Sequence, residues 1–151
     1  MAANVAAAMV STDFITFLDD DDEFALGAGE TIRGRLEKDT DVDIWISGVR
    51  FNQPVTIKYP KGDGDLQTIT STDVCLRKDL GVVPGNVAMP TYRTSVFSKV
   101  PFTDYLPSDQ GEYSDFNHVA ICAQVNYKID WFGEVLYLVR PSLEGTNGVG
   151  R

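Results

Sequence analysis

The feature that most constrains the fold is the apolar run at residues 118–140, HVAICAQVNYKIDWFGEVLYLVR. In its first half Val119, Ile121 and Val125 fall on one face of an extended chain, and in its second half Val135 and Tyr137 do so. Such alternation with a period of two is typical of half-buried strands, and the DWFG segment at residues 130–133 separates the halves. The run therefore predicts a β-hairpin.

Other short runs rich in β-branched and aromatic residues predict further strands, and glycine or proline turn signals separate them. These strands are expected at residues 13–18, 31–37, 41–51, 55–59, 66–70, 73–77 and 94–100. We find no internal repeat and no helical pattern longer than two turns. The sequence thus predicts an all-β protein, an antiparallel β-sandwich or barrel-like domain of the jelly-roll or immunoglobulin-like type with extended N- and C-terminal arms.

The length of 151 residues suits one domain with one core. Residues 1–18 are expected to form an N-terminal arm, because an alanine-rich decapeptide is too short to hold a helix by itself in water. Residues 19–140 are expected to form the β domain, with long loops at residues 78–115, which contain four prolines. Residues 141–151 are expected to form a glycine-rich C-terminal tail.

The net charge of −9 is concentrated in the first half of the chain, where residues 1–75 carry 14 acidic and 6 basic groups. An acidic protein repels a phosphate backbone, so we expect no nucleic-acid partner. No apolar run reaches the roughly 18 residues that a membrane helix needs, so we expect no membrane partner. The first residues lack the basic segment of a signal peptide, so we do not expect secretion by that route.

The acidic run at residues 19–23, DDDDE, is the strongest candidate for a cation site. Calcium and magnesium bind several carboxylates, but adjacent side chains of an extended chain point to opposite faces. The interpretation we favour is a solvated loop. Residues 39–43, DTDVD, fail as an EF-hand, because Ile44 occupies the position of the required glycine. We therefore predict neither a metal nor another cofactor.

His118 is the only histidine, so a catalytic triad would have to use it. Ser114 is the one nucleophile near it in sequence, and no G-x-S-x-G motif surrounds this serine. We therefore expect a strand-edge or surface histidine, no catalytic residue and no enzyme. Carboxylates around one end of the predicted hairpin leave a glycoside-cleaving pair as an open alternative; they are Glu112, Asp115, Asp130 and Glu134.

Apolar and aromatic residues of the expected arms and strands are the candidates for protein interaction. The set is Val5, Met9, Phe14, Phe17, Trp45, Trp131 and Val149. For the two tryptophans, packing between two sheets is the other interpretation.

At the level of class, the chain resembles the small structural proteins of bacteriophage or viral particles, such as capsid-decorating or tail-associated β-sandwich proteins. The resemblance implies a non-enzymatic assembly subunit, located in a virion or an intracellular assembly. Its partners would be copies of itself and a larger shell or tail subunit. The alternative is a carbohydrate- or ligand-binding β module, with Trp45, Trp131 or Tyr92 as stacking platforms and calcium at residues 19–23.

Overall fold

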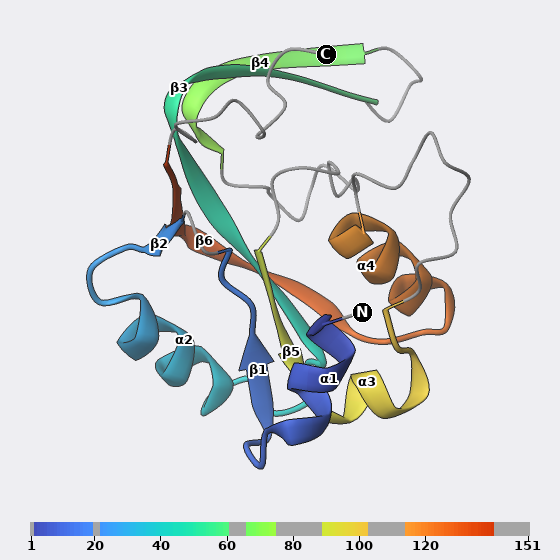
Figure 1. Cartoon of the computed structure of the whole chain (residues 1–151). Coiled ribbons are helices and arrows are strands. Elements are labelled where there is room, and N and C mark those ends of the chain that lie inside the picture. Colours follow the sequence, from blue (N-terminus) through green and yellow to red (C-terminus); the bar gives the residue numbers. More distant parts are fainter. Residues whose placement is uncertain (1, 20–21, 61–65, 75–88, 103–113, 141–151) are drawn as a thin grey trace.

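The computed structural model of the chain describes residues 2–19, 22–60, 66–74, 89–102 and 114–140 (Figure 1). These residues contain both helices and strands. The elements are α1 (Ala2–Met9), β1 (Phe14–Thr16), β2 (Glu23–Phe24), α2 (Ala28–Leu36), β3 (Ile44–Pro60), β4 (Leu66–Val74), β5 (Met89–Arg93), α3 (Ser95–Lys99), α4 (Ser114–Gln124) and β6 (Ile129–Val139).

The six strands form one mixed sheet with the order β1-β5-β3-β6-β2, and β4 also pairs with β3. The long strand β3 organises the sheet, because β5, β4 and β6 all bond to it. β3 and β6 are parallel, whereas the other pairs are antiparallel. Figure 1 shows β3 and β4 curling together away from the rest of the sheet. The expected antiparallel sandwich is therefore not confirmed; the protein has a curled mixed sheet.

Both faces of this sheet are covered by helices. Ile44 and Ile46 of β3 lie in a main core with buried residues of α1, α3 and α4. Trp45, which points to the opposite face, lies in a second core with Leu136 and residues of α2. The helices are correspondingly divided between the two sides of the sheet in Figure 1. Burial on both faces accounts for the continuous apolar character of residues 44–46.

The predicted hairpin at residues 118–140 is wrong in its first half, which is helix α4. Val119 and Cys122, three residues apart, are both fully buried, as a helix face requires. The helix ends at Gln124, and the left-handed φ of 67° at Asn126 allows the Tyr127 amide to donate to Cys122 O at 3.0 Å. The asparagine was the overlooked stop signal. The second half of the run is the strand β6.

The strands predicted at residues 31–37 and 94–100 are also wrong, so the all-β class is corrected. Residues 31–36 belong to α2, where Ile32 and Leu36, four residues apart, pack against the second core. Residues 95–99 form α3, whose adjacent side chains Val96 and Phe97 are both buried in the main core. Neighbours in a strand point to opposite faces, so this adjacency requires a helical backbone.

The turn predicted at residues 52–54 is instead an irregularity within β3. The strand runs through it, and the pairing with β4 shifts register between Arg50 and Val55. Extra residues on one strand bend it, and β3 curves over strongly in Figure 1. The DWFG segment likewise lies within β6, next to a register shift against β3.

Residues 2–18, expected as an arm, contain α1 and β1. β1 pairs with β5, and Ala7 of α1 is buried in the main core. The expected tail at residues 141–151, and residues 78–88 and 103–113 of the expected loops, lie outside the described residues. Within the described part of the chain, no helix has both the length and the apolar character to span a membrane.

Candidate docking surface

Helix α1 exposes apolar side chains on the side that faces away from the sheet. Alanine favours helix more than any other residue, and five of the eight residues in AANVAAAM are alanine. Ala3 and Ala7 pack against the main core. Val5 and Met9, four residues apart, are 60% and 80% exposed and form what we call the apolar ridge. Contiguous exposed apolar side chains mark docking surfaces in other proteins, and methionine is common in such surfaces.

Hydrogen bonds at both ends hold α1 against α3. Asn4 bonds to Phe102, which follows the C-terminal end of α3. At the other end, Thr94 precedes α3 and its Oγ1 donates to Thr12 O at 2.7 Å, while its amide donates to Asp13 O at 2.8 Å. The two helices therefore lie side by side and antiparallel, with α1 beginning where α3 ends.

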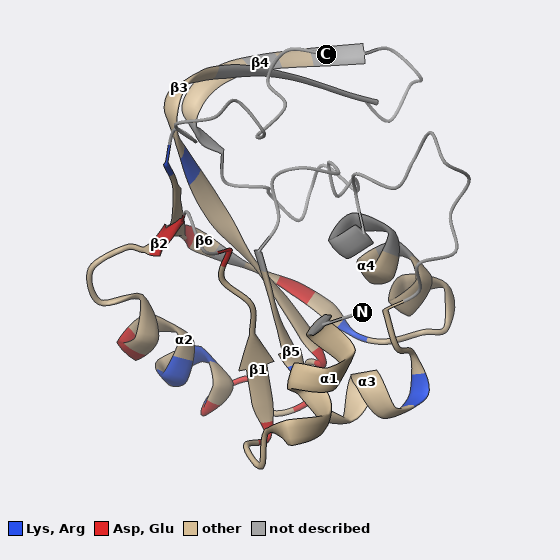
Figure 2. Ribbon diagram, viewed as in Figure 1, with Lys and Arg blue, Asp and Glu red and all other residues tan. Residues whose placement is uncertain are grey.

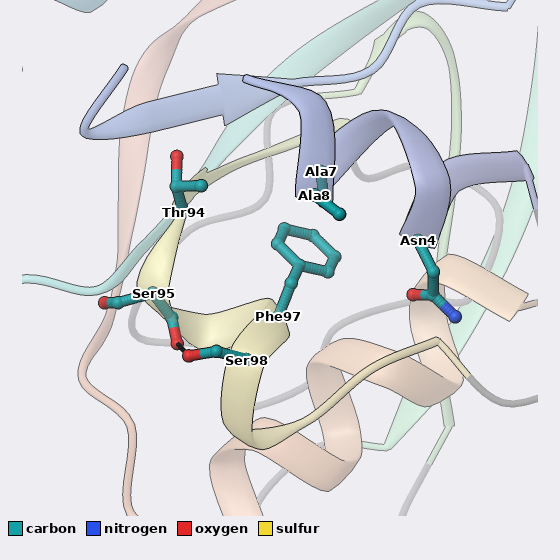
Figure 3. A pocket seen from close by; sticks show the side chains of 7 residues that line it. All are labelled: Asn4, Ala7, Ala8, Thr94, Ser95, Phe97 and Ser98. Atoms are coloured by element: carbon teal, nitrogen blue, oxygen red, sulfur yellow. Dashed lines mark hydrogen bonds between the residues drawn. The ribbon is translucent and has the colours of Figure 1, made fainter. Parts of the chain in front are cut away.

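A shallow pocket of about 300 Å³, which we call the α1–α3 groove, lies between these helices (Figure 3). Its lining residues carry no charge; they are Asn4, Ala7, Ala8, Thr94, Ser95, Phe97 and Ser98. Ser98 Oγ donates to Ser95 O at 2.7 Å, so this hydroxyl is already used within α3. The aromatic ring of Phe97 faces the two alanines in Figure 3. A neutral, largely apolar groove suits an apolar side chain better than a charged small molecule.

Two of the predicted interaction residues, Val5 and Met9, thus lie on this surface, whereas the aromatic ones pack inward. Phe17 makes edge contacts with Tyr92, Phe97 and Phe102 in the main core. Phe14 meets Trp45 edge to face, with ring centroids 5.5 Å apart.

Both tryptophans contribute to packing, although against the helices that cover one sheet and not between two sheets as considered above. Trp45 is 1% exposed and lies in the second core. Trp131 is half-buried against the main core. Neither indole N–H has a hydrogen-bond partner in the described structure. Val149 lies outside the described residues.

His118 is buried in an aromatic cage, so the expected strand-edge or surface position is wrong. It lies on α4 and is 2% exposed, and its ring stacks on Phe102 at 4.2 Å and on Phe97 at 5.2 Å. Its Nε2 donates to Val100 O at 2.6 Å. Burial lowers the pKa of this imidazole, and the hydrogen bond to Val100 only partly opposes that shift. The histidine is therefore a neutral packing residue that fastens α4 to the end of α3.

Cys122 lies one helical turn after this histidine, with Sγ 4.0 Å from Nδ1. Burial, with a smaller contribution from the negative charge of Asp43, raises the pKa of the thiol to about 11. A thiol with so high a pKa beside a neutral imidazole is a poor nucleophile at neutral pH. His118 and Cys122 therefore contribute to the packing of α4.

The described carboxylates of the acidic run bind protein groups. Asp22 accepts hydrogen bonds from the Tyr137 hydroxyl and from the Arg140 amide, and Glu23 pairs with the Arg140 guanidinium. Burial and the hydrogen bond to Asp22 raise the pKa of Tyr137. Within the described residues, no three potential ligands form a metal-binding group. Asp20 and Asp21 lie outside those residues.

Of the four carboxylates considered for glycoside cleavage, the structure describes the side chains of two, Asp130 and Glu134. Asp130 accepts a hydrogen bond from the Trp131 amide at 2.9 Å, and Glu134 is exposed on β6. Glu112 and the side chain of Asp115 lie outside the described part.

Sequence reasoning missed the groove itself. Its signals were Asn4, the one side chain of α1 able to bond a distant backbone, and the neighbouring apolar residues of α3. Neither a protein-family model nor a curated protein matches the sequence.

Proposed function

We propose that the protein is a non-enzymatic assembly subunit that docks on other proteins through the apolar ridge and the α1–α3 groove. The observation that carries the proposal is the exposure of Val5 and Met9 on a helix whose opposite side is fixed to the core. The partners we propose are copies of itself and a larger structural protein, such as the shell or tail subunit of a phage or viral particle. There it would act as a decoration or tail-associated protein.

The shape and charge of this surface support a protein partner. α1 carries no charged residue, and Figure 2 shows its ribbon without acidic or basic colouring. The centre of a protein–protein interface is depleted in charge and tolerates methionine well. A side chain that enters the groove would meet Phe97 and Ala8, which supply apolar contact.

Incorporation into particles tests the proposal. The chain is co-expressed with the structural proteins encoded beside it, and purified particles are examined by negative-stain microscopy and quantitative gel analysis. We expect stoichiometric incorporation and its loss in the variant Val5→Glu/Met9→Glu, because a buried carboxylate must be desolvated. Leu26→Glu is the matched control, since Leu26 is fully exposed on a loop away from α1. Failure of the parent chain to enter any particle, or equal incorporation of all variants, would contradict the proposal.

The alternative function, a carbohydrate- or ligand-binding module with calcium, predicts different results. A glycan array and a thermal-shift series with calcium separate the two functions. An assembly subunit is expected to show neither glycan binding nor a calcium-dependent rise in the melting temperature, whereas a binding module gains stability from its ligand. Saturable glycan binding would favour the module and count against the assembly function.

A further inference from the structure

We propose that a second copy of this chain occupies the α1–α3 groove in a two-fold contact, with the two α1 helices antiparallel. The apolar ridge of each copy would enter the groove of the other. This inference rests on the proposed function and names the first partner of the docking surface. It follows from the shape of the surface and from the charges at its two ends.

The apolar ridge and the α1–α3 groove adjoin on one helix, α1. Asn4 and Ala8 line the groove. The two residues of the ridge, Val5 and Met9, directly follow Asn4 and Ala8 in the sequence. Successive residues of an α-helix are about 100° apart around its axis, so the ridge borders the groove. A two-fold interface uses the same patch on both copies, so that patch must carry both the protruding and the receiving part. This surface has both.

Two oppositely charged residues, Asp13 and Lys99, are exposed at opposite ends of the groove. Asp13 lies at the end where α3 begins, because Thr94 bonds to Asp13 O. Lys99 lies near the end where α3 finishes, beside Phe102 and its partner Asn4. No ion pair joins either residue to another that the structure describes. Antiparallel pairing would place Asp13 of each copy opposite Lys99 of the other.

The net negative charge of the chain opposes self-association, so two copies associate most easily through a surface without charge. Two copies with a net charge of −9 each repel one another. Residues 2–12 carry no charge, so α1 helices can approach without a like-charge contact. An eight-residue helix is only about 12 Å long, and the interface would be smaller than the roughly 800 Å² per partner of a standard complex. The dimer is therefore expected to be weak and to dissociate on dilution.

Sedimentation velocity and light scattering of the purified full chain test this inference, with samples from about 5 to 500 µM, the range in which weak contacts dissociate. We expect monomer at the low end and dimer at the high end. Asp13→Lys and Lys99→Asp, made singly, each create two like-charged pairs and should weaken the dimer about tenfold, whereas the double variant should restore it. Met9→Glu should abolish it, and Leu26→Glu should leave it unchanged. Near-ultraviolet circular dichroism confirms that each variant is folded.

A chain that stays monomeric throughout that range overturns the inference, as does a dimer that the double variant fails to restore. The proposed function is judged separately by incorporation into particles. A monomeric protein that still enters particles would refute the two-fold contact and leave the assembly function intact. A dimer that enters no particle would support the contact and contradict the function.

Discussion

Asn4 and Phe102 lie 98 positions apart and exchange two hydrogen bonds between the side chain of one and the backbone of the other. Asn4 Nδ2 donates to Phe102 O at 2.7 Å, and the Phe102 amide donates to Asn4 Oδ1 at 2.8 Å. The same short segment is held from the other side, since Val100 O accepts the hydrogen bond from His118. Residues 100–102 therefore fasten α1 and α4 together, and the position of the docking surface depends on them.

Asn4→Ala should loosen α1 from the domain, because it leaves the Phe102 amide and carbonyl without their partner. We expect a loss of about 1–3 kcal/mol in the free energy of unfolding, as for other part-buried polar groups that lose a partner. Urea denaturation measures the loss, and hydrogen exchange should show faster exchange at the Phe102 amide. Ser11→Ala, at an exposed position, is the control. A change below about 0.5 kcal/mol, the usual range for surface substitutions, would contradict this role of Asn4.

Acidification should destabilise the protein through His118. The folded state lowers the pKa of this imidazole below its usual value of 6.5, so between the two pKa values the unfolded chain binds the extra proton. Stability should therefore be fully present above about pH 7 and fall as the pH drops through 6.5, by at most about 1.4 kcal/mol per pH unit.

Urea denaturation between about pH 5 and 8 measures this slope, in a window above the usual pKa of carboxylates. His118 is the only histidine, so His118→Gln should flatten the curve. An unchanged slope in the variant would show that another group is responsible. The absolute stability of the variant does not bear on the question.

The strands that the sequence predicted best are those that are apolar on both faces of the chain. Residues 44–46 and 135–139 gave clear patterns because the sheet buries them in two cores. Short helices were missed because each covers only a few buried positions, which fit a period of two nearly as well as one of 3.6. After α4, the left-handed conformation of Asn126 prevents the helix from continuing. A stop signal that consists of a single residue is easily overlooked in a sequence.

The docking surface could be predicted only in part. Val5 and Met9 were identified from their apolar character, but an isolated ten-residue segment gave no reason to expect a stable helix. Its stability comes from packing of Ala7 and from the bond between Asn4 and Phe102. A contact between residues so far apart in the chain cannot be recognised from the local sequence pattern. Trp45 is the opposite case. Its aromatic side chain suggested a role in recognition, but it is buried in the second core.

Cys122 should react very slowly with thiol reagents while the protein is folded. Burial raises the pKa of its thiol from an ordinary value of 9.0 to about 11, and the side chain has no exposed surface. That rise in pKa lowers the fraction of thiolate at pH 8 about 100-fold. Ellman's reagent at this pH measures the rate in a Cys75→Ser background, which isolates the Cys122 thiol. Rapid reaction in buffer, similar to that in concentrated urea, would contradict the buried position of Cys122.

Arg93 should contribute more to stability than its charge suggests, because it joins three parts of the chain. Its Nη2 donates to Thr40 O and Val42 O at 2.8 and 3.0 Å, and its guanidinium lies 4.8 Å above the Phe14 ring. Arg93→Lys keeps the charge but cannot reproduce this planar geometry, so we expect a loss of about 1.5–3 kcal/mol in the free energy of unfolding.

Arg35→Lys is the matched control for that substitution. Among the described residues, the Arg35 side chain forms an exposed pair with Asp39 at 3.7 Å, and such pairs contribute about 0–1 kcal/mol, so the conservative change should have little effect. Urea denaturation of both variants at pH 7 makes the comparison. If Arg93→Lys were as stable as Arg35→Lys, the charge of Arg93 would suffice, and its hydrogen bonds to the chain between α2 and β3 would contribute little.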